Sequence, residues 1–356
     1  MGRDEAMRST LNALPVQSMK MLTVEQLKHA WARSEPIDFP DVYLSQIEYD
    51  QKETFYPLGF PLMVSTNSSQ VLDAAAECWS RFKKVFDFEP ITMNIGVTAG
   101  TSRDCPSAPG CRMRGHLAST FADGENFVIS DYLHAISNMW VTDSTLEHRD
   151  YFRHFFLTST AMGQIANGYA WGIHAACVEL DGAGILLCGD SGAGKSTLSF
   201  ACARAGWTYI TDDGSYLVDA RNDRLIVGDC SMIRFRQSSE NIFSELRGRP
   251  AMQRAEIGKP SIEFATASVP LFSTSSMSRI KHVVFLNRNV DKQELVPFPV
   301  EVARLYMLQR ASSAPELRKR QARMFDRLLE GSVFELRYTD LDWAVERLHQ
   351  LVFRGR

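Results

Sequence analysis

A glycine-rich segment at residues 189–196 has the residue types and spacing of a phosphate-binding loop. Its sequence, GDSGAGKS, satisfies the pattern G-x-x-x-x-G-K-[S/T] at every fixed position. In such a loop the backbone N–H groups turn toward a phosphate, the lysine reaches the β- and γ-phosphates, and the last hydroxyl ligates Mg²⁺. The sequence therefore predicts that ATP and Mg²⁺ bind here. The residues expected to contact the nucleotide are Gly189, Asp190, Ser191, Gly192, Ala193, Gly194, Lys195, Ser196 and Thr197.

The segments on either side of this loop match the elements that must position it. Residues 184–188 form a short apolar run that predicts a buried strand, and residues 197–204 have apolar side chains at helical spacing. This order places the positive end of a helix dipole at the phosphate. The alternative, a glycine-rich turn that happens to precede a lysine, does not explain the flanking strand and helix.

Two adjacent carboxylates follow the next predicted strand, at residues 207–210. Asp212 and Asp213 lie at its C-terminal end, where acidic groups are well placed for phosphoryl transfer. One can bind the metal, and the other can accept the proton of an attacking hydroxyl. Because successive side chains on a strand point to opposite sides, we expect a division of these roles. Away from a phosphate loop, the same residues would indicate only an Asp-Asp-Gly turn.

A histidine lies in the predicted strand before the loop strand. This strand covers residues 169–180 and contains His174, and the sequence DGAG at residues 181–184 predicts a hairpin between the two strands. A histidine among apolar neighbours is more often a core residue than a catalyst. One whose hairpin partner carries a phosphate loop can orient a carboxylate or hold its charge, so His174 is a candidate site residue.

Composition and charge argue against several classes of protein. The chain has 356 residues, of which 45% are hydrophobic and 23% charged, and a net charge of −3. These values are typical of a globular protein and unlike those of basic nucleic-acid-binding domains. No apolar run approaches the ~20 residues that cross a bilayer, and the start of the chain lacks a secretory signal and a persuasive myristoylation site. The odd number of cysteines, seven, is typical of a reducing compartment. We expect a cytoplasmic protein without nucleic-acid or membrane partners.

A second group of potential metal ligands is formed by Cys105, Cys111 and His116. The C-x₅-C spacing is wider than that of a zinc knuckle, and no second cysteine pair accompanies it. A proline- and glycine-rich turn that carries two thiols is the better interpretation.

The pattern along the chain predicts three parts. Residues 1–40 form a loosely attached arm with a helix at residues 24–34 that Thr23 caps. Residues 41–150 form a smaller α+β N-terminal domain, and residues 151–356 form the domain with the phosphate loop. Residues 237–277 are polar and basic and predict a mobile substrate loop. Further predicted strands are 55–64, 91–97, 127–130, 216–218, 225–227, 233–236, 282–286 and 333–338; further helices are 67–86, 149–166, 300–311, 315–330 and one from 341.

Four short segments carry a family resemblance. They are IHAA at 173–176, LCGDSGAGKS at 187–196, AGW at 205–207 and TDD at 211–213. Together they resemble the catalytic domain of the HPr kinase/phosphorylase family, in which a histidine precedes a GDSGxGKS loop and a later strand ends in an Asp-Asp pair. The resemblance covers about residues 169–218 and extends more weakly to VFELR at 333–337.

This resemblance implies a fold, a reaction and a role for each site residue. The fold is α/β, a P-loop kinase domain of the HPr kinase and PEP carboxykinase type, preceded by a smaller α+β domain. The reaction is Mg-ATP-dependent phosphorylation of a serine hydroxyl, reversible by phosphorolysis. Lys195 would hold the nucleotide phosphates, and Ser196 and Asp212 would hold the metal. The residues implied in catalysis are Asp213 as general base, His174 as its assistant, and Ser191 near the transferred phosphoryl group.

The chain departs from the family at a further motif. The family's E-[I/V]-R-G-x-G run, whose glutamate helps to bind metal, has a partial counterpart in ELRGR at 245–249, further along the chain and without the last glycine. Glu245 is therefore better interpreted as a solvated helix end. Arg247, Arg249 and Lys259 can neutralise a phosphate or an acidic partner, although exposed basic residues usually have no specific role. The N-terminal part does not match the family, so the acceptor and the phosphorylase activity stay open.

Three functions agree with these motifs. The first is an ATP-dependent kinase that transfers the γ-phosphate to a serine or other hydroxyl of a protein or small molecule. The second is an ATP-binding regulatory module or slow ATPase, in which Asp213 would orient water. The third is a carboxykinase-like enzyme, against which the chain shows no basic residues arranged as a manganese-carboxylate site. A carboxylate base favours the first. HPr is one candidate acceptor, and we expect a homo-oligomer because kinases of this kind often form rings.

Overall fold

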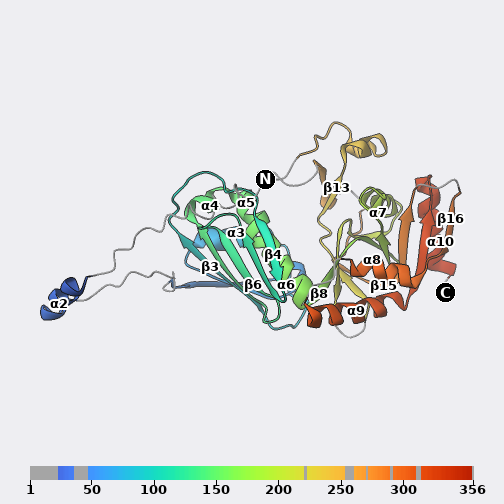
Figure 1. The fold of residues 1–356 in the computed structure, drawn as a ribbon. Helices are drawn as coiled ribbons and strands as arrows, with labels where there is room; N and C mark the ends of the chain where they lie inside the picture. The colour runs from blue at the N-terminus through green and yellow to red at the C-terminus, as the bar shows by residue number, and fades with distance from the viewer. Residues whose placement is uncertain are drawn as a thin grey trace, which may run out of the picture.

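The computed structural model describes residues 23–35, 47–219, 223–252, 260–269, 272–288, 292–309 and 314–354. It is a mixed α/β structure with two large sheets, and the short helix α2 (Val24–Ala32) stands apart from them (Figure 1). Thr23 caps α2 as predicted, because its hydroxyl accepts the Gln26 N–H while the Gln26 side chain accepts the Thr23 N–H. Within the described residues, no helix has the length and apolar character that a bilayer crossing requires.

The first sheet has seven strands in the order β1-β2-β3-β7-β6-β5-β4. Strands β2, β3 and β7 run parallel, and the other pairs are antiparallel. The strands predicted at 91–97 and 127–130 are confirmed. The extended run predicted at 55–64 is wrong in its middle, where a 3₁₀ turn at Pro57–Gly59 separates two strands. The strands are β1 (Gln51–Phe55), β2 (Leu62–Thr66), β3 (Ile91–Thr98), β4 (Gly110–Arg114), β5 (Leu117–Phe121), β6 (Phe127–Asp131) and β7 (Ile136–Thr142).

Helices cover one face of this sheet and share its apolar core. The helix predicted at 67–86 ends earlier, because the backbone N–H groups of Val85 and Phe86 donate to the carbonyl of Gly59 instead of continuing the helix. Phe86 then stacks on Phe60, with ring centroids 4.5 Å apart. The helix predicted at 149–166 is confirmed, with one π-helical stretch inside it. The helices are α3 (Ser69–Trp79), α4 (Asp143–Glu147), α5 (Arg149–Tyr151), the π-helical segment Phe152–Thr158 and α6 (Ser159–Gly168).

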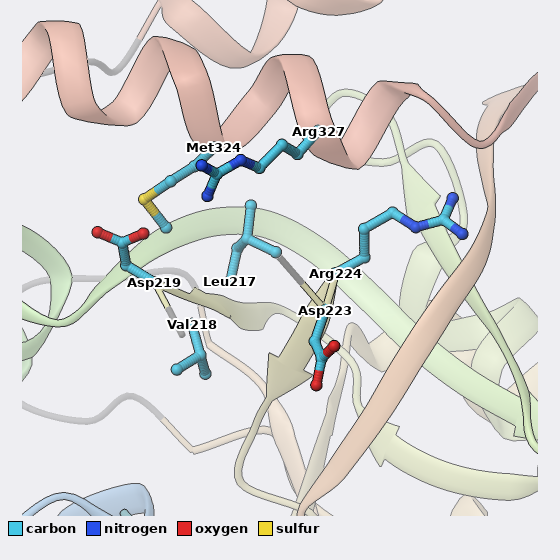
Figure 2. A pocket seen from close by; sticks show the side chains of 7 residues that line it. All are labelled: Leu217, Val218, Asp219, Asp223, Arg224, Met324 and Arg327. Atoms are coloured by element: carbon cyan, nitrogen blue, oxygen red, sulfur yellow. The ribbon is translucent and has the colours of Figure 1, made fainter. Parts of the chain in front are cut away.

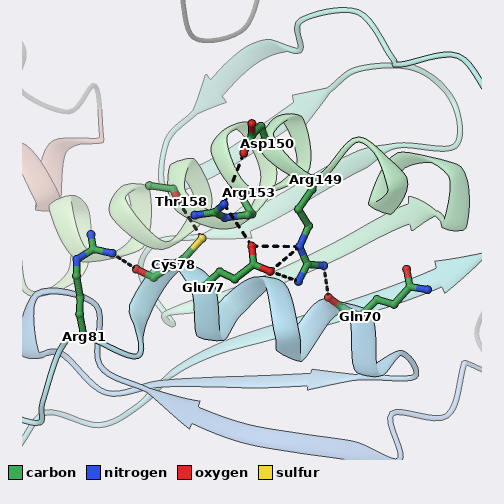
Figure 3. Close-up of polar contacts among 8 residues, drawn as sticks. All are labelled: Gln70, Glu77, Cys78, Arg81, Arg149, Asp150, Arg153 and Thr158. Carbon is green, nitrogen blue, oxygen red and sulfur yellow. Dashed lines mark hydrogen bonds and ion pairs between the residues drawn. The ribbon is translucent and has the colours of Figure 1, made fainter. Parts of the chain in front are cut away.

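An ion-pair network fastens α3 to this helical segment (Figure 3). Glu77 lies 2.9 Å from Nη2 of Arg149 and 3.2 Å from Nη1 of Arg153. Arg149 also donates to the carbonyl of Gln70, at 2.7 Å. The hydrogen bond from Arg149 lowers the pKa of Glu77 below its usual value. A single carboxylate thus joins two arginines of the later helices to α3.

The second sheet is built around strand β9, which leads into the glycine-rich loop. β9 pairs antiparallel with β8 and parallel with β15, and β15 pairs parallel with β17. The predicted hairpin is confirmed by the pairing of Leu180 with Ala183. The strands are β8 (Ala170–Leu180), β9 (Ala183–Cys188), β10 (Thr208–Thr211), β11 (Gly214–Val218), β12 (Leu225–Val227), β15 (Met277–Asn287), β16 (Glu294–Pro297) and β17 (Ser332–Arg337).

Helices cover both faces of this sheet (Figure 1). Helices α7 (Lys195–Arg204) and α10 (Leu341–Arg354) share a core with Ile185 and Leu187 of β9. On the other face, α8 (Val300–Leu308) and α9 (Pro315–Leu329) share a core with Leu186 and Cys188. Since both faces of β9 are covered, its residues are apolar without alternation. The loop that follows β9 therefore emerges from a strand fixed on both sides.

A small fourth core forms next to α7 and includes part of the region predicted to be a mobile loop. Strand β13 (Met232–Phe235) pairs with β14 (Ile262–Ala265), and two 3₁₀ turns, Gln237–Asn241 and Ser244–Leu246, follow β13. The described part of 237–277, which the sequence predicts as a mobile substrate loop, therefore contains a strand and 3₁₀ turns. Its aromatic residues are too widely spaced to give a periodic signal, yet they gather around Phe200 of α7. The aromatic members are Phe200, Tyr209, Phe235, Phe243 and Phe264.

One buried histidine on β15 gives the fold a predictable pH dependence. His282 is 4% exposed, and neither ring nitrogen has a hydrogen-bond partner among the described residues. Burial lowers the pKa of His282 from 6.5 to about 4, helped by the positive charges of Lys281 and Arg224. The unfolded chain therefore binds the proton more tightly, so the free energy of unfolding should fall between pH 6.5 and 4, by up to about 3 kcal/mol.

Replacing this histidine with leucine tests that expectation. In His282→Leu, the decrease in the free energy of unfolding between pH 6.5 and 4 should be smaller by up to about 3 kcal/mol. The measurement is thermal unfolding at several pH values, in which the melting temperature of the variant should fall less on acidification. Comparison of the two proteins at pH 8 shows any packing defect separately, because His282 is neutral there in both states. An identical acid slope in the variant would contradict the assignment.

Candidate functional site

The glycine-rich loop connects β9 to α7 in a conformation that needs glycine at defined positions. Gly192 and Gly194 both have φ of 97°, in the left-handed region. A Cβ on Gly194 would lie 2.8 Å from the hydroxyl of Tyr338, so a side chain there would collide with a packed residue. The sequence pattern thus has a structural cause, since the loop turns tightly at the N-terminus of α7.

The lysine of the motif is folded back over this loop. Lys195 is 6% exposed, and its Nζ donates to the carbonyl oxygens of Gly189 at 2.7 Å and Asp190 at 3.2 Å. Its positive charge is therefore held within the loop rather than in solvent. An anion that replaced these carbonyls as hydrogen-bond acceptor would meet a desolvated ammonium group.

Strand β8 brings the predicted histidine, the loop strand and the aspartate pair together. Ala175 pairs with Cys188, the last residue of β9, and its N–H donates to the carbonyl of Asp213 at 3.0 Å. One position earlier, His174 pairs with Gly214 in the ladder between β8 and β11. The Nδ1 of His174 lies 2.6 Å from Oδ1 of Asp213. Residues far apart in the sequence thus meet around His174 and Ala175 of β8, which pairs with both β9 and β11.

The carboxylate of Asp213 is ionised and accessible. The hydrogen bond from His174 lowers its pKa, and the charges of His174, Lys195 and Arg234 act in the same direction against burial. Its side chain is still 59% exposed, so the carboxylate faces solvent beside the histidine. A carboxylate of this kind can accept a proton from a neighbouring hydroxyl.

Asp212 has the opposite environment. It is 7% exposed, and its carboxylate accepts hydrogen bonds from the hydroxyl of Tyr209 at 3.2 Å and the N–H of Arg234 at 3.0 Å. Burial raises the pKa of Asp212, while the N–H of Arg234 and the hydroxyl of Ser196 lower it. Within the described ranges, this carboxylate forms no ion pair.

These surroundings fit a divalent cation. A buried carboxylate and a serine hydroxyl of the loop helix are hard oxygen donors, the kind that Mg²⁺ prefers. A cation would also supply the positive charge that Asp212 lacks in the described part of the chain. Asp212 and Asp213 therefore point to different partners, one to Ser196 and the other to His174.

A residue that the sequence interpretation missed lies directly over the loop. Nη2 of Arg236 donates to Oγ of Ser191 at 3.0 Å, and its Nη1 is 3.6 Å from the position of a Cβ built on Gly192. No ion pair involves Arg236 in the described segments. The available signal was the R-F-R sequence at residues 234–236, where alternation in an extended chain places both arginines on the same side; Arg234 lies in β13, and Arg236 follows it with extended backbone.

Two hollows differ in their relation to this site. A cavity of about 130 Å³ adjoins the loop and β8; it is lined by Trp171, Gly172, Ile173, His174, Asp190, Ser191, Tyr306, Met307 and Gln309. Another hollow, between α9 and the end of β11, measures about 10 Å³ and shares none of these residues (Figure 2). That volume is close to one water molecule, so it is too small for a substrate.

The remaining candidates lie elsewhere. Glu245 is in a 3₁₀ turn and pairs with Arg204 at 3.3 Å, and Arg249 stacks over Phe264 at 4.7 Å. Lys259 lies outside the described residues. The exposed Cys105 and Cys111 form no disulfide, and the part of the chain that the structure describes contains no group of three metal-binding His, Cys, Asp or Glu side chains.

Comparisons with known proteins give distant structural similarity only. No protein-family model matches the chain, and no curated protein matches it. Among solved structures, the chain is similar to the Hpr(Ser) kinase/phosphatase from Coxiella burnetii, at 16% sequence identity and a TM-score of 0.28. The similarity covers 52% of this chain and 99% of that chain. The function of this chain is therefore inferred from the geometry of its own residues.

Proposed function

We propose that this chain is an ATP-dependent kinase of the HPr kinase-like type, which transfers the γ-phosphate to a hydroxyl group. The observation that carries the proposal is the contact of 2.6 Å between His174 and Asp213, beside a phosphate-binding loop and at the edge of a cavity that His174 and Ser191 line. A base next to a cavity favours an ordered acceptor over random attack by water.

Different residues around the loop bind different parts of Mg-ATP. The backbone N–H groups of the loop and the Nζ of Lys195 hold the nucleotide phosphates. Ser196 and Asp212 hold Mg²⁺, which neutralises phosphate charge when bound. Arg236 lies over Ser191 and stabilises the negative charge of the transferred phosphoryl group. Most of the rate enhancement then comes from positioning and electrostatics.

Asp213 acts as the general base in the transfer step. Its carboxylate accepts the proton of the acceptor hydroxyl while that oxygen forms a bond to the γ-phosphorus. The bond between the γ-phosphorus and the bridging oxygen breaks, ADP leaves, and the proton passes from Asp213 to solvent. His174 holds the carboxylate in place and keeps it ionised. In phosphorolysis, inorganic phosphate would attack the phosphorus of the phosphorylated acceptor, next to Ser191, and form pyrophosphate. The bond from phosphorus to the acceptor oxygen would break, and Asp213 would return a proton to that oxygen.

The test is to follow the label of γ-labelled ATP in the presence of Mg²⁺ and hydroxyl-containing acceptors, both small alcohols and serine peptides. Label in an acceptor supports the kinase. Label found only in inorganic phosphate, at a rate that no acceptor changes, would instead identify a slow ATPase or regulatory module and contradict the proposal.

Replacing Arg236 with alanine should lower kcat of phosphoryl transfer by about 10²-fold, because a charged donor over the reacting group is lost. The affinity for ATP should change much less. Arg236→Lys should recover part of kcat. The matched control is Arg249→Ala. It removes an arginine that stacks on Phe264 of β14, the partner strand of β13. Equal effects of the two alanine variants on kcat would argue against a role at the phosphate.

A further inference from the structure

We infer that the phosphate acceptor is a small alcohol without negative charge, bound in the cavity between β8, the glycine-rich loop and α8. The inference rests on the proposed kinase function and adds the chemical class of the acceptor. It comes from the position, the size and the charges of this cavity.

The cavity lies where an acceptor hydroxyl is needed. Its wall includes His174, which holds the proposed base Asp213, and Ser191, which accepts a hydrogen bond from Arg236. An occupant of the cavity is therefore adjacent both to the base and to the loop that holds the phosphates. In the transfer, the hydroxyl oxygen of this occupant bonds to the γ-phosphorus of ATP, ADP leaves, and the hydroxyl proton passes to Asp213.

The volume limits the occupant to a small molecule. A cavity of about 150 Å³ accommodates a benzene ring, so the 130 Å³ found here corresponds to about six non-hydrogen atoms. The hydroxymethyl group of a protein serine would fill a small part of this space and leave a void. Because voids forfeit packing contacts, a free alcohol of matching size is favoured over a serine side chain.

The charges of the wall disfavour an anion. Among the described residues, the cavity is lined by no lysine or arginine but by Asp190, which forms no ion pair in that part of the chain. Trp171 and Tyr306 contribute aromatic surface, which tolerates or attracts a cationic group. Lys195 and Arg236 contact Asp190 and Ser191 of this wall, but in the proposed function both bind the phosphates of ATP. An acceptor carboxylate or phosphate would therefore meet Asp190 without a further compensating charge. The ammonium group of an amino alcohol would suit both the carboxylate of Asp190 and this aromatic surface.

An acceptor series of nearly constant size tests this inference on the unmodified chain. Serinol, glycerol and glycerate present the same three-carbon skeleton with a positive, zero and negative charge. With Mg-ATP, kcat/KM should decrease in that order, with serinol at least about tenfold above glycerate. In Asp190→Asn the advantage of serinol over glycerol should disappear. A preference for glycerate, or phosphorylation of serine peptides but of none of these alcohols, would overturn the inference while leaving the kinase intact.

Filling the cavity provides a second, independent test. Met307 is 4% exposed and lines the cavity, whereas Leu305, on the same helix, is 65% exposed. Met307→Trp should lower kcat/KM for serinol at least about tenfold and leave ATP affinity unchanged, while Leu305→Trp should change neither. If Met307→Trp folds and phosphorylates serinol at the parental rate, the acceptor does not bind in this cavity. The acceptor series needs no variant, so it tests the inference even if Met307→Trp does not fold. If the unmodified chain only hydrolyses ATP and phosphorylates no alcohol or serine peptide, the proposed kinase function itself is wrong.

Discussion

Replacing Lys195 with alanine is expected to lower kcat/KM for ATP by about 10²- to 10³-fold. The ammonium group of Lys195 is buried in the loop and donates to the carbonyls of Gly189 and Asp190, so its removal takes the positive charge out of the loop itself. A charge-assisted hydrogen bond in such a desolvated place contributes more than one at the surface. Nucleotide affinity measured by calorimetry and turnover measured with labelled ATP should both fall.

Two further variants separate this effect from loss of structure. Lys292→Ala removes an exposed lysine that pairs with Glu294 at 3.0 Å, and should leave affinity and turnover unchanged. Lys195→Arg keeps the charge but not the shape of the donor, so it should recover ATP affinity more than turnover. If Lys195→Ala melts like the parent and still binds and turns over ATP, residues 189–196 are not a phosphate-binding loop.

Local sequence signals predicted the elements around the loop well. The apolar run of β9 and the helix that begins at Lys195 are each continuous in the chain, and Asp181 and Gly182 join β8 to β9 directly. The same holds for β15, whose middle is apolar and buried. Each of these elements is specified by residues within about ten positions of one another, which is the range in which periodicity and turn chemistry are informative.

The parts that depend on long-range contacts were not predictable. Arg236 reaches Ser191 only because β13 packs next to α7, and nothing in the R-F-R sequence indicates which loop it approaches. The cavity wall combines β8 with Tyr306 and Met307 of α8, which are more than 100 positions away in the chain. The aromatic core around Phe200 could not be predicted for the same reason, since its members come from distant parts of the chain. In each case the contact depends on which segments pack together, and the local sequence pattern does not contain that information.

Asp213→Asn should reduce phosphoryl transfer by about 10²- to 10⁴-fold and retain ATP affinity. The amide keeps the shape of the side chain and can still bond to His174, but it cannot accept the proton of the acceptor hydroxyl. The measurement is transfer of label from ATP to acceptor, with ATP binding followed separately. The same substitution at the neighbouring position, Asp212→Asn, is the informative comparison. Its defect should be relieved in part by raising the Mg²⁺ concentration, whereas that of Asp213→Asn should not.

The pH profile distinguishes a proton-accepting Asp213 from a merely structural one. Its pKa is lowered by the hydrogen bond from His174, so the carboxylate is ionised above its usual value of 3.8 and protonates only below it. Activity should therefore show no acid limb from this group between pH 5 and 8. In His174→Ala the lowering contact is lost while burial, which raises the pKa, remains. The acid limb of kcat/KM should then move upward, which a structural role for His174 would not cause. Parental transfer rates in Asp213→Asn, with the proton still lost from the acceptor, would require a different base.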